Sequence, residues 1–344
     1  MPEKYCNNHL RVWFSATLFL FSLLPATFQP VHEAWAADRL IGIHSARVMS
    51  QSMPWIAQEA GLFKKYDLDF RLIYIATSSS VTAAMLGGDA EIALVGGGGI
   101  IRAFVQGAND IVFIGGVKNI LTHSILAKPE IKTPEDLKGK TIGVERFGSN
   151  PHYFATQALR RLGIDPVKDV NFIQSEGSPE TLTALLTGRL DAATMTAPQD
   201  SIALSRGFHY VIYGPDLRLP FAAAVFVTRR PEISRRAQVL ARFMRAMAEA
   251  AKILHTDKEF TYKVLEKQLR LKDRKILDAA YNGEIKALDP KIDIKPDGLQ
   301  AILDDVAKTD PRAKGVKAED MVDRRFLDEM GKSGFFDGLW EGKR

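Results

Sequence analysis

Short polar or glycine-rich clusters recur where an apolar, strand-like segment gives way to a helix-like one. The candidate ligand-binding residues in these clusters are Ser45, Arg47, Met49, Ser79, Ser80, Gly97, Gly98, Ser149, Asn150, Tyr153 and Thr196. Hydroxyl and amide groups, together with the unpaired N–H groups at a helix start, can hold a small molecule without any covalent step. The residue types therefore predict non-covalent binding.

The clusters in the first part of the chain offer three kinds of contact. Arg47 can donate two hydrogen bonds to a carboxylate or sulfonate. An equally good interpretation is that Arg47 is an exposed loop residue without a ligand. One serine of the Ser78–Ser80 run caps a helix, which leaves hydroxyls such as those of Ser79 and Ser80 for a ligand. Gly97 and Gly98 allow backbone to approach a ligand closely or simply form a flexible turn.

The clusters in the second part of the chain are similar. Ser149 and Asn150 can donate and accept hydrogen bonds at a strand-to-helix turn. Tyr153 can stack on the ring of a ligand, or it can be buried in the core of its own half of the chain. Thr196 lies in a loop where its hydroxyl can contact a ligand or cap the next helix.

The composition argues against several other chemistries. Cys6 is the single cysteine, the histidines are isolated, and no zinc-ligand spacing or nucleophile motif is present, so we expect no metal, no cofactor and no catalytic residues. The net charge is +5, but basic residues such as those of 235–245 have acids nearby. We therefore expect solvated helix faces and no nucleic-acid partner.

The N-terminus has the three parts of an export signal. Lys4 and Arg11 precede an apolar run over 12–24, and Ala34-Trp35-Ala36 has the A-x-A form of a cleavage site. A membrane span needs about 20 apolar residues, more than this run provides. Because Cys6 precedes the run, no lipid anchor is indicated. We expect cleavage after Ala36, or one residue later, and a periplasmic protein.

Strand-like and helix-like segments then alternate in two similar units. The first unit has strands over 40–43, 69–75 and 91–95, helices over 54–63 and 81–86, and, after the glycine run 96–99, a helix through Gln106. The second unit has strands over 141–144, 170–174 and 191–195 with helices over 151–162 and 179–187. Such βαβαβ units predict parallel sheets with right-handed crossovers, and hence an α/β fold.

The remaining segments suggest how the two units are joined. An apolar strand over 221–227 returns to the first unit, and the chain is mainly helical from Pro231 onward. The expected organisation is a signal peptide over 1–36, lobe 1 over 37–126, lobe 2 over 127–221, and over 222–344 the return strand and C-terminal helices of lobe 1. Two crossings between the lobes predict a hinge.

Four segments carry a resemblance to a known family. The first, Met53–Asp69, resembles a P-x-x-x-A-x-E-x-G-x-F-x-x-x-G-L-D pattern, with Tyr66-Asp67 where the pattern has Gly before Leu-Asp. The segments 78–93, 137–144 and 185–193 follow in the same order. Together they resemble the sulfonate-, taurine- and nitrate-binding (SsuA-like) periplasmic proteins of ABC importers, a family that also includes binders of thiamine precursors.

The resemblance implies a type II periplasmic-binding-protein fold whose two lobes close on a small organic solute. It also implies a monomer that delivers the solute to the transmembrane subunits of an ABC permease. Arg47 and the helix starts favour an anionic solute, such as a sulfonate or carboxylate, whereas Tyr153, Met49 and Trp55 suit an aromatic or apolar body; the sequence does not separate the two. The alternatives are an enzyme on the same fold, such as a pyrimidine-precursor synthase, and a sensory domain that reports to a membrane partner.

Overall fold

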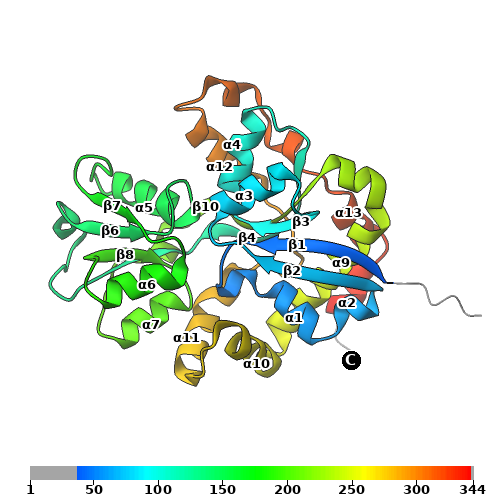
Figure 1. Ribbon diagram of the computed structural model, residues 1–344, viewed down its shortest axis with the longest axis horizontal. Coiled ribbons are helices and arrows are strands. Elements are labelled where there is room, and N and C mark those ends of the chain that lie inside the picture. Colours follow the sequence, from blue (N-terminus) through cyan, green and yellow to red (C-terminus); the bar gives the residue numbers. More distant parts are fainter. Residues whose placement is uncertain (1–36, 342–344) are drawn as a thin grey trace, which may run out of the picture. The chain divides into compact units, whose positions relative to one another are not determined.

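The strands form two separate five-stranded sheets, each covered by helices (Figure 1). The computed structural model describes residues 37–341. The expected export signal and its cleavage site, residues 1–36, lie outside these residues. We call the part around each sheet a lobe.

The first sheet has the strand order β2-β1-β3-β10-β4. Its strands are β1 (Asp38–His44), β2 (Leu68–Tyr74), β3 (Ile92–Val95), β4 (Ile111–Leu121) and β10 (Leu219–Arg229). β1 pairs in parallel with β2 and β3, whereas β10 runs antiparallel to both β3 and β4. The three parallel strands end at one edge, so the loops that follow them lie together.

The second sheet repeats this arrangement with the order β7-β6-β8-β5-β9. Its strands are β5 (Ser124–Ala127), β6 (Thr141–Val144), β7 (Asn171–Gln174), β8 (Ala192–Met195) and β9 (His209–Ile212). β6 is parallel to β7 and β8, and β5 is the antiparallel strand. The expected α/β fold of two lobes is confirmed, but both sheets are mixed. The antiparallel strand of each is the one that enters from the other lobe.

Two chain segments cross between the lobes. β4 ends at Leu121 and β5 begins at Ser124, while the return runs from β9 through α8 (Gly214–Leu217) into β10. The expected boundary between residues 126 and 127 falls within β5, and β10 begins at Leu219, ahead of residue 222. β4 and β10 pair as far as Leu121 and Leu219, so the two crossings start side by side.

The helices of the first lobe follow its parallel strands. They are α1 (Met53–Glu59), α2 (Leu62–Lys65), α3 (Ser78–Gly87) and α4 (Gly97–Val105). The expected helix over 54–63 is divided because Gly61 has a φ of 69°, a left-handed conformation that ends the first helical run. Gly97, Gly98 and Gly99 form the first turn of α4, so they do not form a flexible turn ahead of the helix.

The helices of the second lobe take the equivalent positions around its sheet. They are α5 (Asn150–Arg161), α6 (Ser178–Leu186) and α7 (Gln199–Ser205). Between β5 and β6, Pro134–Leu137 forms a short 3-10 helix.

The C-terminal part is helical, as expected. Its helices are α9 (Arg230–Thr256), α10 (Lys258–Leu269), α11 (Arg274–Glu284), α12 (Pro296–Val306), α13 (Arg325–Lys332) and α14 (Phe335–Trp340). α9 packs on α1 and α2, and α12 packs on β10 and α4, while α11 reaches α7 of the second lobe. Within residues 37–341, no helix is both long and apolar enough to cross a membrane.

Candidate functional site

A small cavity lies between the lobes, where loops and helix starts from both sheets meet. It is lined from the first lobe by Ser45, Ala46, Val48, Ser50, Gln51, Ser78, Lys118 and Ala223, and from the hinge and second lobe by His123, Glu145, Asn150, Pro151 and Thr196. We call this cavity and its lining the cleft. Its volume is about 30 Å³, room for one or two water molecules, so the lobes are closed on each other.

The first wall of the cleft is the loop after β1, which Gln51 holds in place. The backbone N–H groups of Ser45 and Ala46 donate to Gln51 Oε1 at 2.9 and 3.0 Å, and Gln51 Nε2 donates to Ser45 Oγ at 2.7 Å. All three partners come from one short loop. Ser45 is therefore held by its own loop and needs no ligand to be ordered.

Glu145 supplies an acidic group to the opposite wall. It follows β6 and accepts a hydrogen bond from the hydroxyl of Ser178. Burial raises the pKa of Glu145 to about 7, against which the Ser178 hydrogen bond acts. Among the described residues, no Lys or Arg forms an ion pair with it. Glu145 can therefore be a proton donor or a carboxylate near neutral pH.

His123 lies in the hinge and presents an unused polar atom. Its side chain is 7% exposed, and Nδ1 has no hydrogen-bond partner among the described residues. Burial, and next the charge of Lys118, lower the pKa of His123 to about 3, so the ring is neutral. A buried polar atom without a partner costs about 1–3 kcal/mol, and a bound solute could satisfy it.

The cation of the cleft, Lys118, is already paired. Its Nζ lies 2.6 Å from Glu284 Oε2 on α11, and both side chains are buried. Glu284 Oε1 also accepts from the hydroxyls of Thr122 and, at 2.8 Å, Thr196. This network neutralises Lys118 and ties Thr196 of the second lobe to α11 of the first.

Two further hydrogen bonds join the lobes at the cleft. Asn150 Nδ2 donates to the carbonyl of Ala223 on β10 at 2.8 Å. The backbone N–H of Met49 donates to the carbonyl of Ala197 at 3.3 Å. Because each bond joins residues of different lobes, both bonds break when the lobes separate.

Three of the residues expected from the sequence line the cavity, namely Ser45, Asn150 and Thr196. Three other expected residues, Ser79, Ser80 and Ser149, form hydrogen bonds that stabilise the turns around the cavity. Ser149 Oγ donates to the carbonyl of Arg146 at 2.6 Å, Ser79 Oγ and Ser80 Oγ each lie 3.1 Å from Thr77 Oγ1, and Ser80 also accepts from Arg146 across the lobes at 3.4 Å.

The remaining expected residues lie outside the cavity lining. The Met49 side chain is buried in the core of the first lobe. A Cβ on Gly97 would lie 2.8 Å from Ala222, and one on Gly98 3.2 Å from Phe221, so these glycines pack against β10. Tyr153 packs on Phe221 with 4.6 Å between ring centroids, and Arg47 lies at a separate pocket. Ligand contact at each of these positions stays a prediction.

Five polar cleft residues were not expected from the sequence: Ser50, Gln51, Lys118, His123 and Glu145. Ser78 belongs to the serine run 78–80, from which ligand contact was expected. A lysine inside the apolar run of β4 was a signal, because a buried ammonium needs a partner. Glu145 directly follows a parallel strand, the same position that pointed to the other candidates. His123 carried no local signal, because only the crossing of the chain brings it to the cleft.

The chemistry of the cleft is that of hydrogen bonding. It offers hydroxyls, the side-chain amides of Gln51 and Asn150, an unpaired imidazole nitrogen and an acid of raised pKa. In the part of the chain that the structure describes, no three His, Cys, Asp or Glu side chains are grouped to hold a metal ion.

A comparison with protein families finds a match over residues 52–259 to the family described as NMT1/THI5 like. A relative by sequence is YtlA of Bacillus subtilis (strain 168), a putative binding protein by name, which is 23% identical over 215 residues. The match covers 60% of this chain and 64% of that relative, so this chain spans less than two thirds of the relative's length.

Solved structures share the fold at lower identity. The alkanesulfonate-binding protein SsuA of Xanthomonas axonopodis pv. citri, bound to MOPS, is 19% identical with a TM-score of 0.70, over 84% of this chain and 98% of that one. The periplasmic aliphatic sulphonate binding protein SsuA of Escherichia coli is 20% identical with a TM-score of 0.65, over 84% and 92%. The desulfurization enzyme DSZB is 13% identical with a TM-score of 0.65, over 86% and 99%.

Proposed function

The chain belongs to the NMT1/THI5-like family, and from that premise we propose that it is the solute-binding component of an ABC importer. It captures a small organic solute in the cleft and delivers it to the transmembrane subunits of a permease. The observation that carries the proposal is a cavity bounded by both lobes, with an unpaired His123 Nδ1 and the buried Glu145 in its lining. The shared fold of proteins named as sulfonate-binding supports it.

Capture works by hinge closure. A solute that touches Ser78 on one lobe and Asn150 on the other gains both sets of contacts only when the lobes are closed. Its binding therefore shifts an open–closed equilibrium by the free energy of the contacts that form on closure. No covalent step is needed.

The proposed solute is an organic anion of the sulfonate or carboxylate class. The starts of α3 and α5 reach the cavity at Ser78 and Asn150, and helix starts favour negative charge. Lys118 adds no free charge, because Glu284 neutralises it. Glu145 must be protonated when an anion lies beside it, and its raised pKa allows this near pH 7.

The pH dependence of binding tests this solute class. We expect calorimetric titration with a panel of sulfonates and carboxylates to give at least one ligand whose affinity rises as the pH falls from 8 to 6. The gain approaches tenfold per pH unit above the pKa of Glu145, and Glu145→Gln removes it. A ligand bound more tightly at pH 8 would show a cationic solute. Absence of heat and of a melting shift across the panel would contradict solute binding.

We further propose that the protein acts as a periplasmic monomer. The export segment over 1–36 supports this location, as does the shared fold of the Escherichia coli SsuA, which is named as periplasmic. Mass spectrometry of protein recovered from the periplasm should give an N-terminus at Ala37 or Asp38, and light scattering the mass of one chain. An intact N-terminus on a membrane-bound protein contradicts the proposal.

An enzyme is the second candidate, because DSZB shares the fold. Another structure of DSZB is of a mutant with serine in place of a cysteine, in complex with biphenyl-2-sulfinic acid. In the present chain, residues 37–341 contain no cysteine, so a thiol nucleophile is absent from the described cleft. Turnover of a bound solute, lost in Glu145→Gln, would favour catalysis over transport.

A further inference from the structure

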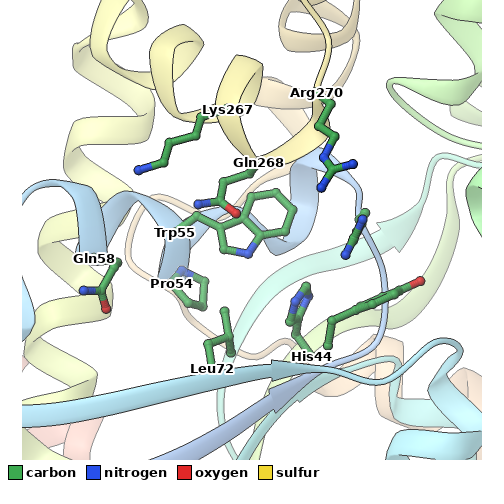
Figure 2. A pocket seen from close by; sticks show the side chains of 10 residues that line it. His44, Pro54, Trp55, Gln58, Leu72, Lys267, Gln268 and Arg270 are labelled. Carbon is green, nitrogen blue, oxygen red and sulfur yellow. The ribbon is translucent and has the colours of Figure 1, made fainter.

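A second, larger pocket lies on the flank of the first lobe, beside the loop after β1, which also contributes residues to the cleft. Its walls are the ends of β1 and β2, helix α1 and the end of α10, and its volume is about 460 Å³ (Figure 2). The lining residues are His44, Arg47, Pro54, Trp55, Gln58, Leu72, Tyr74, Lys267, Gln268 and Arg270. We call it the flank pocket. No cleft residue lines it.

The flank pocket is positively charged. Arg47, Lys267 and Arg270 line it, and no Asp or Glu does. Lys267 has an ion-pair partner outside the lining, Glu59 at 2.6 Å. Among residues 37–341, neither Arg47 nor Arg270 forms an ion pair. Two guanidinium groups therefore face one concave surface with their hydrogen-bonding capacity free for an anion.

The backbone holds Arg270 in an unfavourable conformation at the end of α10. Its φ is 54°, a left-handed conformation that costs a non-glycine residue about 1–2 kcal/mol. In Figure 2 the Arg270 side chain reaches from α10 toward the wall formed by His44, with the Trp55 indole beside it. The end of the helix thus presents this guanidinium to the pocket.

The opposite wall is aromatic. The His44 ring lies 5.5 Å from that of Trp55 and 5.2 Å from that of Tyr74, between ring centroids. The Arg47 guanidinium carbon lies 4.8 Å from the centroid of Tyr74, a cation–π contact that holds the arginine over the ring. Flat rings beside two guanidinium groups suit a ligand that combines a planar body with an acidic group.

We propose that the flank pocket is a second ligand site, which binds an aromatic carboxylate or sulfonate. The acidic group of the ligand lies between Arg47 and Arg270, and its ring packs against Trp55 and Tyr74. The site shares no lining residue with the cleft, and all of its lining residues belong to the first lobe. It would hold an anion on a protein whose cleft is empty or already occupied.

Calorimetric titration with benzenesulfonate and benzoate tests the proposal on the full chain. We expect the double variant Arg47→Gln/Arg270→Gln to weaken binding of both probes by at least about tenfold, the worth of one charge-assisted contact. Arg71→Gln, an exposed arginine of β2 outside the pocket, is the matched control and should bind as the unmodified protein does. Methanesulfonate, which lacks the ring, should bind at least about tenfold more weakly than benzenesulfonate.

Variants of the cleft separate this site from the proposed function. Glu145→Gln and Asn150→Ala should leave benzenesulfonate binding at the flank pocket unchanged, even if solute binding in the cleft is lost. The proposal is overturned if neither probe binds at millimolar concentration. It is also overturned if the cleft variants abolish binding while the double arginine variant keeps it. Circular dichroism checks that each variant is folded.

Discussion

Glu145 is a buried acid that has a hydroxyl partner, Ser178, but no cationic one among the described residues. A carboxyl group in this position destabilises the fold when it ionises, because its burial is not offset by a counter-charge. His123 is the matching case of an unpaired buried nitrogen. Such groups are expected where a ligand supplies the missing partner.

Replacing the acid should therefore stabilise the protein at alkaline pH. The pKa of Glu145 is raised to about 7 from 4.5, so the folded state binds more protons than the unfolded state between these values. Its contribution is fully present below the lower value and is lost as the pH rises through about 7. We expect Glu145→Gln to raise the free energy of unfolding by about 1–3 kcal/mol at pH 8, as measured by urea titration.

At pH 4 the same substitution should change stability little, because the acid is then protonated in both states. Glu130→Gln, which replaces an exposed glutamate of the second lobe, is the control and should not show this pH-dependent gain. Equal stability of Glu145→Gln and the unmodified protein at pH 8 would contradict a buried, unpaired acid at this position.

Helix α4 shows how an element can set the closed state. Gly96, the residue before its first turn, lies so close to the second lobe that a Cβ there would overlap Asn150 Oδ1. Its φ of −75° suits alanine, so Gly96→Ala should not strain the backbone. It should instead keep the lobes from closing, and we expect at least about a tenfold loss of solute affinity by titration.

Gly283→Ala is the control for this substitution, because a Cβ at Gly283 of α11 meets nothing within 4 Å. It should bind solute as the unmodified protein does. If Gly96→Ala binds equally well and closes fully by small-angle scattering, close packing of α4 on Asn150 is not needed for closure.

Strand β4 and helix α11 are tied by the buried Lys118–Glu284 pair. Lys118→Met leaves the Glu284 carboxylate buried without a cation, which we expect to cost about 3–5 kcal/mol in the free energy of unfolding. Adding Glu284→Gln should recover most of this loss, since a glutamine oxygen can still accept from Thr122 and Thr196. Chemical denaturation of the unmodified protein, the two single variants and the double variant measures the coupling between Lys118 and Glu284. If the losses of stability in the two single variants simply add in the double variant, the two residues are not coupled.

At the scale of the whole molecule, closure links solute binding to stability. A solute present at 100 times its Kd should raise the free energy of unfolding by about 2.7 kcal/mol. Small-angle scattering should show a smaller radius of gyration at the same concentration, because the lobes then stay closed. A melting shift without any compaction would mean that the solute binds one lobe only.

Much of this architecture could be predicted from the sequence. The strands over 40–43, 69–75 and 141–144 alternate with helices, and this order gives two lobes because each strand needs a covering helix to bury its side chains. β4 could not be predicted in the same way, since Lys118 interrupts its apolar pattern. Nor could the mixed sheets, because local pattern does not show the direction in which a strand pairs.

The candidate site was only partly predictable. Ser45, Asn150 and Thr196 follow parallel strands or begin a helix, so their place at the cleft follows from topology. Their neighbours Lys118, His123 and Glu284 come from a strand, the hinge and a distant helix. Their roles depend on which atoms are buried together, and on the charges that burial leaves paired or unpaired.

The sequence by itself determined the order of elements, the two-lobed fold and the family, because periodicity and short motifs act over a few residues. Only the tertiary structure decided that Lys118 is neutralised by Glu284, that Glu145 is not paired with a cation, and that Arg47 faces the flank pocket and not the cleft. The physical reason is that pKa and charge complementarity depend on distance and desolvation in space, and these are set by segments far apart in the chain.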